Sequence, residues 1–368
     1  MQITFPHMGD MAVAVKALFQ ELGFSVVVPP PISRKTLNLG VKYSPEFACL
    51  PFKINLGNFM EALDKGADLV VMGGGCGPCR FGYYAEVQRE ILQEKGYEFS
   101  MYVIEPGIID NIRKIRETFG PLSMRKVASA VRLAWNKAAA IDEIYSLVLK
   151  KRALEAEEGV VDKLYAGFIR EIDEAMSLDG IRRIKKKYRE KIEDSSAEYK
   201  RGLPLKVGLV GEIYLVLESF VNLEIEKKLG QLGVMVEREL YMSTWLLNFF
   251  HLRNDEKHIK RAARQYLGSF VGGHGIDSIG NTVRYSRRGF DGVVQLGPFT
   301  CMPEIVARSI LPAVSKAEGI PILTFFFDEH SADAGIQTRL EAFVDLLERK
   351  KRQKMRGSEY KGEIVYGQ

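Results

Sequence analysis

Four cysteines have the residue type and spacing best suited to chemistry in this 368-residue chain: Cys49, Cys76, Cys79 and Cys301. Cys76 and Cys79 form a C-x-x-C pair in the segment GGGCGPC. Cysteines at this spacing bind zinc or iron–sulfur clusters, form redox dithiols, or occur by chance as small buried side chains. So few cysteines in so long a chain do not indicate a disulfide framework.

The positions of the cysteines along the chain favour a site for a bound group. The apolar strand predicted over 67–72 leads through three glycines to the C-x-x-C pair, and the strand predicted over 293–296 leads through a Gly-Pro loop to Cys301. Cys49 comes directly before another amphipathic helix. Helix N-termini lower thiol pKa values and stabilise anions, and open parallel sheets bind ligands at the carboxyl ends of their strands. A thiolate-ligated, net-anionic cofactor fits such a place.

The spacing leaves the identity of the bound group open. Thioredoxin-type exchange would suit Cys-Gly-Pro-Cys, but the chain lacks a compact thioredoxin-sized unit, and Cys301 would have no role. Zinc would use the same four thiolates as an iron–sulfur cluster. The five histidines show no H-x-x-H or H-E-x-x-H spacing, so a histidine metal site is not expected.

Three further residues could transfer protons beside the cysteines. Glu212 follows the strand predicted over 205–210, and Asp328 and His330 follow the apolar run ILTFFF. Side chains at strand ends point toward the same cleft, where they could donate or accept protons. A strand-end turn for Glu212 and a helix-capping role for Asp328 are the competing interpretations.

The elements that must position these residues predict an α/β fold with three regions. Short apolar runs alternate with helical patterns over 1–106, which predicts a cysteine-bearing domain with a parallel sheet covered on both faces. Strands are absent from 107–203, where long amphipathic patterns predict a helical region. A second α/β domain, carrying Cys301, is predicted over 204–368.

Composition and charge exclude several classes of protein. The chain is 46% hydrophobic and 27% charged, which is typical of a globular protein. Its net charge of +5 is diffuse, and the basic run over 182–191 is flanked by acidic residues, so a solvated helix face is favoured over nucleic-acid binding. No apolar run reaches the roughly 18 residues of a membrane span, and the N-terminus does not have the pattern of a signal peptide. We therefore expect a cytoplasmic protein with neither nucleic acid nor membrane as partner.

Five segments together resemble one known superfamily, that of the 2-hydroxyacyl-CoA dehydratase components. The resemblance is closest to the uncharacterised branch associated with ATP-dependent CoA-enzyme activases, which is related to double-cubane cluster proteins. The segments are EFACLPFK at 46–53, GGGCGPCRFGYY at 73–84, GEIYLVLESFVNLEIEKKLGQLGV at 211–234, LGPFTCMPEIVARSILP at 296–312 and FDEHSADAGIQTRLEAFVDLL at 327–347.

This resemblance implies two flavodoxin- or Rossmann-like domains plus helices, with an iron–sulfur cluster in the cleft between them. Cys49, Cys76, Cys79 and Cys301 match the family's cluster ligands position by position, so a [4Fe-4S] cluster is expected. Its electrons would come from a separate ATP-dependent iron–sulfur activase, and the protein would reduce or dehydrate a small substrate. Because members of the superfamily pair, the resemblance also implies a homodimer.

Two departures from the family pattern affect this interpretation. Dehydratase subunits commonly use three cysteines per cubane and leave one iron open, whereas a fourth cysteine here could close the site. The alternative is therefore a non-catalytic electron-transfer or cluster-carrier subunit. A double cubane generally takes six cysteines, so a single [4Fe-4S] cluster is the simpler expectation. No residues match an acyl-CoA pocket, and the substrate stays open.

Overall fold

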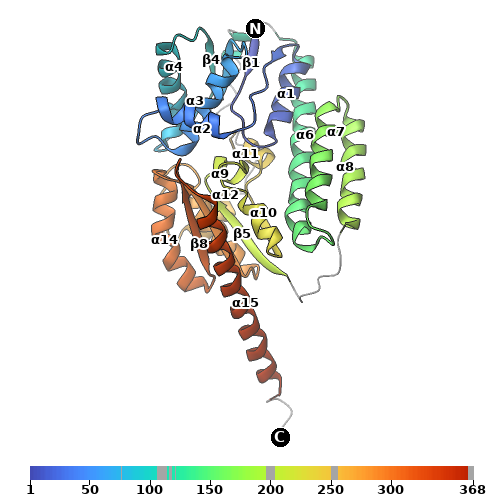
Figure 1. The fold of residues 1–368 in the computed structure, drawn as a ribbon, viewed down its shortest axis with the longest axis vertical. Coiled ribbons are helices and arrows are strands. Elements are labelled where there is room, and N and C mark those ends of the chain that lie inside the picture. The colour runs from blue at the N-terminus through green and yellow to red at the C-terminus, as the bar shows by residue number, and fades with distance from the viewer. Residues whose placement is uncertain are drawn as a thin grey trace.

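The computed structural model describes residues 1–75, 77–105, 114–115, 118–120, 122–195, 204–249 and 256–363. It contains two four-stranded sheets, each with all strands parallel, and a set of long helices beside them (Figure 1). The α/β class predicted from the sequence is confirmed.

The two sheets have the same topology. The first has the order β2-β1-β3-β4 and the second the order β6-β5-β7-β8. The strands of the first are β1 (Gln2–Thr4), β2 (Ser25–Val26), β3 (Leu69–Gly73) and β4 (Ser100–Ile104). Those of the second are β5 (Leu205–Gly211), β6 (Val234–Arg238), β7 (Gly292–Pro298) and β8 (Ile322–Phe327). In each sheet the chain reverses its direction of winding between the two central strands, which is where open parallel sheets generally bind ligands.

Helices cover the sheets, because strands buried on both faces need apolar partners on each side. Those that follow strands of the first sheet are α1 (Met11–Glu21), α2 (Arg34–Tyr43), α3 (Leu50–Leu63), the 3₁₀ helix η1 (Arg80–Tyr83) and α4 (Tyr84–Glu94). Those that follow strands of the second are α9 (Ile213–Leu217), α10 (Ile225–Gln231), α11 (Met242–Phe249), α12 (Glu256–Ala263), α13 (Gly275–Arg287), α14 (Met302–Glu318) and α15 (Asp333–Glu363).

Helix α3 is shared between the two sheets, which explains why every one of its residues is buried. Leu50 and Ile54 pack in the core of the second sheet, whereas Phe52 and Leu56 pack in the core of the first. Helix α2 crosses α3 at contact distance, because a Cβ on Gly57 would lie 2.0 Å from a backbone oxygen of α2. The α2–α3 pair therefore joins the two halves of the molecule.

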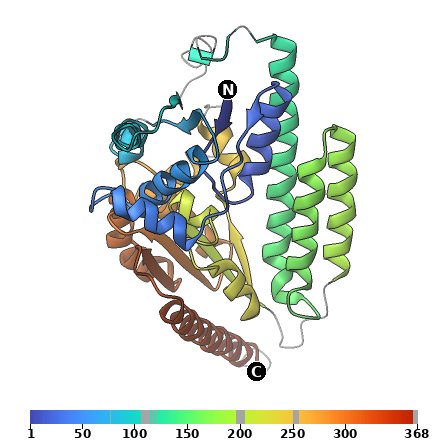
Figure 2. The same cartoon turned by 45° about the horizontal axis from the view of Figure 1, so that its top comes forward.

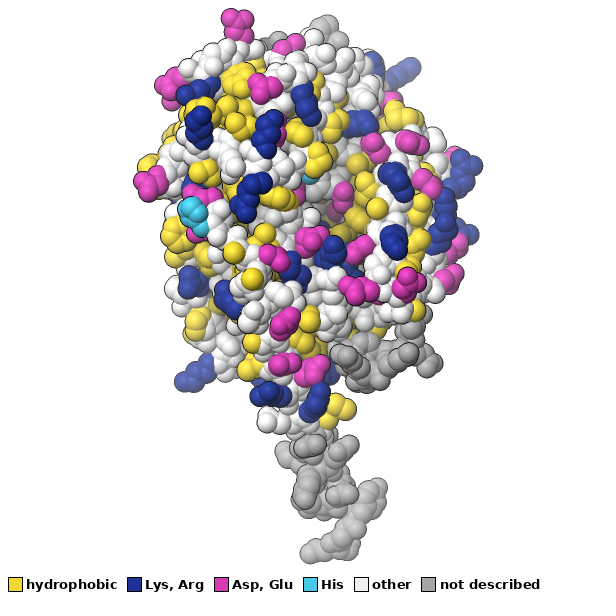
Figure 3. Space-filling view, in the orientation of Figure 1, with side chains coloured by type: hydrophobic (Ala, Val, Ile, Leu, Met, Phe, Trp, Pro, Cys, Tyr) yellow, Lys and Arg dark blue, Asp and Glu magenta, His cyan; other side chains and the backbone are white. Residues whose placement is uncertain are grey.

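The long helices form a third layer: α6 (Met124–Lys151), η2 (Arg152–Leu154), α7 (Val160–Glu174) and α8 (Leu178–Asp194). Figure 2 shows α6, α7 and α8 in green, side by side along one flank. Their shared core includes Phe168, Ile172 and Tyr188. Basic and acidic side chains intermingle over the outer helices in Figure 3, and Lys187 of the basic run pairs with Glu171 at 2.6 Å. The basic side chains of the run at 182–191 thus lie on a charged, solvated face of α8, whereas its Tyr188 faces the core.

Several elements differ from the sequence expectations. The sequence pattern predicts one helix after Glu212, over 213–229, but the structure interrupts it between α9 and α10, because Glu218 leaves the helix and binds the first half of the chain. Its carboxylate accepts hydrogen bonds from the Gly9 amide at 2.8 Å and contacts His7 Nδ1 at 3.0 Å. Helix α2 was not predicted. Within the helical region the sequence pattern also predicts a helix over 108–119, most of which lies outside the described residues. None of the helices in the described part of the chain has the length and apolar character that a membrane span needs.

Candidate functional site

Three loops that carry cysteines meet where the two sheets face each other. These cysteine loops are residues 45–49 before α3, 77–83 after β3 and 299–301 after β7. The Arg80 guanidinium donates a hydrogen bond to the carbonyl oxygen of Phe47 at 3.0 Å and two others to the carbonyl and hydroxyl oxygens of Thr300. The Thr300 hydroxyl in turn donates to the Phe47 carbonyl at 3.1 Å. One arginine thus ties the first sheet's loops to the second sheet's loop.

A glycine pair before α13 packs against the second of these loops. A Cβ on Gly272 would lie 2.8 Å from the Cys79 amide nitrogen, and one on Gly273 would lie 3.9 Å from Cys79 Sγ and 3.1 Å from the ring of Pro303. Both glycines also have positive φ angles, +85° and +45°. Only glycine allows the backbone to approach the cysteine loops this closely.

Each described cysteine stands directly before a helix, as predicted: Cys49 before α3, Cys79 before η1 and Cys301 before α14. All three are free thiols. Backbone amides in the first turn of each helix donate toward the sulfur atoms, which favours thiolate. Cys76, the remaining predicted ligand, lies outside the described residues.

Burial opposes ionisation of these thiols. It raises the pKa of Cys49 to about 11, and it raises the pKa values of Cys79 and Cys301 as well. The negative charge of Glu212 adds to the rise at all three, whereas the Arg80 charge lowers the pKa of Cys49 and Cys79. Because a thiolate here needs a nearby positive charge, and because sulfur is the donor that zinc and iron–sulfur clusters prefer, the chemistry of these donors suits a metal or cluster.

Glu212, a candidate for proton transfer, lies with the cysteines. It follows the central strand β5 and caps α9, where its carboxylate accepts the Leu215 amide at 3.1 Å. Burial raises the pKa of this carboxyl to about 7. It can therefore hold or release a proton near neutral pH.

Sequence reasoning missed a second buried carboxylate, Glu304, in the first turn of α14. It is fully buried, and its carboxylate accepts hydrogen bonds from Ser278 Oγ and Gln295 Nε2, each at 2.9 Å. Burial raises the pKa of this carboxyl to about 7. A signal existed in Gln295, a polar residue within the otherwise apolar strand β7.

A tyrosine at the start of α4 was also missed. The Tyr84 hydroxyl lies in hydrogen-bond contact with Cys49 Sγ, and the tyrosine side chain is only 6% exposed. The segment GGGCGPCRFGYY contains two adjacent tyrosines, and nothing in the sequence separates the buried Tyr84 from the exposed Tyr83.

Asp328 and His330 lie in the turn after β8. The Asp328 carboxylate accepts the His330 amide at 3.0 Å and the Ser331 hydroxyl at 2.9 Å, so it stabilises its own turn. Between them, Glu329 pairs with Lys53 of α3 at 2.6 Å. Directly before this turn, the Phe327 carbonyl accepts the Phe299 amide of the third cysteine loop at 2.7 Å. Among the described residues, no hydrogen bond or ion pair joins Asp328 or His330 themselves to the cysteine loops.

Exposed apolar side chains surround the cysteine loops. Phe47 and Phe299 are 70% and 60% exposed, and Phe270 lies against Gly77. We call the whole set the apolar collar: Phe47, Tyr83, Phe270, Phe299, Met302 and Ile305. Large exposed side chains concentrated in one place are typical of surfaces that contact a partner.

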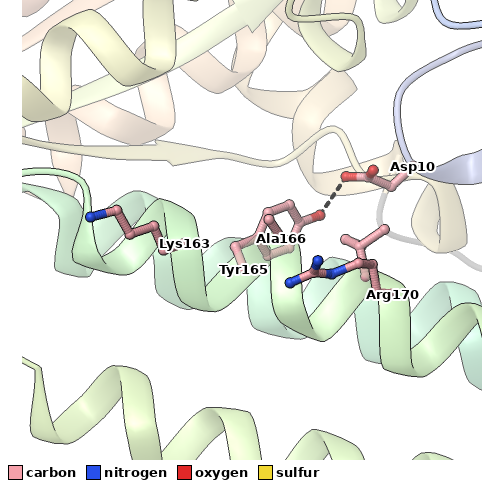
Figure 4. A pocket seen from close by; sticks show the side chains of 6 residues that line it. Asp10, Lys163, Tyr165, Ala166 and Arg170 are labelled. Atoms are coloured by element: carbon pink, nitrogen blue, oxygen red, sulfur yellow. Dashed lines mark hydrogen bonds between the residues drawn. The ribbon is translucent and has the colours of Figure 1, made fainter.

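Two cavities lie away from the cysteines. The larger, about 530 Å³, opens beside α7, where the Tyr165 hydroxyl donates to Asp10 at 2.6 Å (Figure 4). The smaller, about 350 Å³, lies between α6 and the start of α8. Within the described ranges, which omit Cys76, no three Cys, His, Asp or Glu side chains are arranged to hold a metal ion.

One known family matches part of the chain. Residues 7–72 match the family described as "CoA enzyme activase uncharacterised domain (DUF2229)". The match includes Cys49 and ends within β3, just before the C-x-x-C pair. No curated protein matches the sequence. The N-terminal part of the chain therefore carries a domain associated with CoA enzyme activases.

Proposed function

We propose that this chain is an iron–sulfur protein of the 2-hydroxyacyl-CoA dehydratase type. Cys49, Cys76, Cys79 and Cys301 bind a [4Fe-4S] cluster between the two sheets. An ATP-dependent activase supplies electrons at low potential, and the protein uses them to reduce or dehydrate a small substrate.

The observation that carries the proposal is the meeting of cysteine loops from both sheets. Cys49 and Cys79 come from the first sheet and Cys301 from the second, and Arg80 ties their loops together. Each sulfur stands at a helix start, where backbone amides favour an anionic group. The association of residues 7–72 with CoA enzyme activases supports the link to such a system.

In this proposal the chain's residues bind the cluster, shield it from water and supply protons to the substrate. When bound, the cluster supplies single electrons at low potential. The glycine pair Gly272–Gly273 closes one side of the site by backbone packing. Glu212, whose carboxylate accepts the Leu215 amide at 3.1 Å and whose pKa is raised to about 7, holds a proton and passes it toward the substrate.

The apolar collar supports the proposed contact with an activase. Electron transfer to a buried group requires close approach of the donor, and the collar lies beside the three cysteine loops. Its six side chains offer an apolar surface around the site, so a donor protein can exclude water there.

The test is to measure iron and acid-labile sulfide per chain in protein purified without oxygen, with EPR spectra after dithionite reduction. We expect about four irons and four sulfides with the signal of a reduced cubane. Replacing Cys49, Cys79 or Cys301 by Ser should reduce the cluster content, whereas a solvent-exposed Ser309→Ala control should not. Zinc without sulfide would contradict the proposal and leave the cysteines as structural zinc ligands.

The alternative is an electron-transfer or cluster-carrier subunit whose four cysteines close the cubane. The fourth cysteine favours this alternative, because a cubane with one open iron needs only three cysteine ligands. Four equal losses of cluster in the four Cys→Ser variants would support this alternative. One dispensable cysteine, together with an EPR spectrum that changes when a small ligand is added, would support the enzyme.

A further inference from the structure

Tyr84 and Cys49 come from different helices and meet inside the site. Cys49 precedes α3, and Tyr84 is the first residue of α4, 35 positions later. Both are buried, and the phenol oxygen lies in hydrogen-bond contact with Cys49 Sγ. Among the described residues, Cys49 Sγ is the hydrogen-bond partner of the Tyr84 hydroxyl.

Neighbouring rings fix the orientation of the phenol. The Tyr84 ring meets the Phe52 ring edge-on, at 5.1 Å between centroids and 90° between planes, and the Phe81 ring at 5.3 Å and 65°. A phenylalanine ring has no strong acceptor atom, so neither ring competes with Cys49 Sγ for the hydroxyl hydrogen. The hydroxyl is therefore held against Cys49 by packing, without dependence on a flexible side chain.

The hydroxyl keeps its proton at physiological pH. Burial raises the pKa of Tyr84 well above its ordinary value, and the nearby Cys49 raises it further. When Cys49 binds a metal or cluster its sulfur is a thiolate with no hydrogen to give, so the neutral phenol beside it acts as the donor. The hydrogen bond also lowers the pKa of Cys49, which burial otherwise raises.

We infer that Tyr84 is a positioning residue that donates its hydroxyl hydrogen to Cys49 Sγ and so makes the group bound by this sulfur easier to reduce. The inference rests on the proposed cluster. A hydrogen bond to a ligating sulfur stabilises the additional negative charge of the reduced state and raises the reduction potential. Cys79 and Cys301 have backbone donors, from Phe81 and Glu304, whereas Cys49 also receives this side-chain donor.

Tyr84→Phe removes the donor and keeps the ring, and Tyr83→Phe is the matched control, because Tyr83 is 74% exposed. In the cluster-loaded protein we would measure the midpoint potential by EPR-monitored redox titration. We expect Tyr84→Phe to lower the equilibrium constant for reduction by about three- to tenfold, or ~30–60 mV for one electron. Iron and sulfide contents and the potential of Tyr83→Phe should match the wild type. An unchanged potential in Tyr84→Phe would overturn the inference, as would a variant that merely loses cluster.

A second measurement does not need the cluster. In metal-free protein, a double-mutant cycle of Tyr84→Phe and Cys49→Ala measures the coupling between the two side chains through the denaturant midpoint of unfolding. If the hydroxyl donates to the sulfur, the double variant should lose less than the two single losses together, whereas a cycle of the exposed Tyr83→Phe with Cys49→Ala should be additive. Additive losses for Tyr84→Phe and Cys49→Ala would refute the hydrogen bond. If no variant takes up iron, the proposed function fails, but this measurement still decides whether Tyr84 acts on Cys49.

Discussion

The buried carboxyl of Glu304 should make the stability of the metal-free protein depend on pH. Its pKa in the folded state is raised to about 7, against 4.5 ordinarily, chiefly by burial. The folded state therefore binds this proton more tightly than the unfolded state does. The stabilisation is complete below pH 4.5 and is lost as the pH rises through 7. Since each pKa unit corresponds to about 1.4 kcal/mol, Glu304 costs the folded state about 3 kcal/mol at pH 8 relative to pH 4.5.

Glu304→Gln tests this value, because the amide keeps an oxygen that can accept from Ser278 or Gln295 but does not titrate. The assay is denaturant unfolding of both proteins between pH 4.5 and 8, with the difference in unfolding free energy taken at each pH. Any cost of the amide itself is the same at every pH and drops out of the comparison. As the pH rises from 4.5 to 8, we expect the unfolding free energy of the variant to increase by about 3 kcal/mol relative to that of the wild type.

Glu90→Gln is the control for charge removal alone, because Glu90 lies on the exposed side of α4. Its stability should follow the wild type at every pH within about 0.5 kcal/mol. Parallel pH profiles for Glu304→Gln and the wild type would refute the reasoning. They would mean that water or structural relaxation reaches Glu304 and removes the cost of its burial.

Two further substitutions test the joint between the two sheets. Glu329→Gln removes the carboxylate that lies 2.6 Å from the Lys53 ammonium, which is 6% exposed. We expect a loss of about 2–4 kcal/mol in unfolding free energy. The control Glu86→Gln removes an exposed ion pair and should cost less than about 1 kcal/mol. Gly57→Ala places a Cβ 2.0 Å from a backbone oxygen of α2, so it should lower the melting temperature strongly or prevent folding. The control Gly335→Ala in α15 has open space around the new methyl group and should be neutral or slightly stabilising. A neutral Gly57→Ala would show that α2 and α3 do not cross as closely as described.

Much of the fold could be predicted from the sequence because the strands of a parallel sheet are buried on both faces. Such strands read as short apolar runs, and β3, β5, β7 and β8 were all found in this way. Helix α2 was missed because its segment, RKTLNLGVKY, is polar and follows three prolines. The interruption between α9 and α10 was also not predictable, since Glu218 is drawn out by partners about 210 residues away.

The site could be predicted as far as motifs and local order reach. Strand-then-helix patterns placed Cys79 and Cys301 at helix starts, and the amphipathic pattern after Cys49 placed it at another. The contacts that shape the site join residues from different elements, and the sequence does not contain them. The Tyr84 hydroxyl contacts Cys49, 35 residues earlier in the chain, and the Glu304 carboxylate accepts a hydrogen bond from Ser278 of another helix.

The contrast between Glu212 and Asp328 shows why local pattern alone could not assign the proton-transfer residues. Both follow an apolar strand, so the sequence treats them alike. Strand β5 is central and lies beside β7, so the residue after it lies near the loop that carries Cys301, and the charge of Glu212 acts on this thiol. Strand β8 is at the edge of the same sheet, and the turn after it reaches Lys53 of α3. Strand order, which depends on how the whole sheet assembles, therefore decides which of two similar residues lies beside the cysteines.

The same argument explains why the site belongs to the whole chain. The segment associated with CoA enzyme activases, residues 7–72, holds Cys49 but ends before the C-x-x-C pair. Cys301 and Glu212 come from the second sheet, and Arg80 connects it to the first. Because α3 packs on both sheets while Cys49 stands at its first turn, a displacement of one sheet would move Cys49 relative to Cys301. Binding of a group by sulfurs from both halves should therefore depend on the same packing that holds the two sheets together.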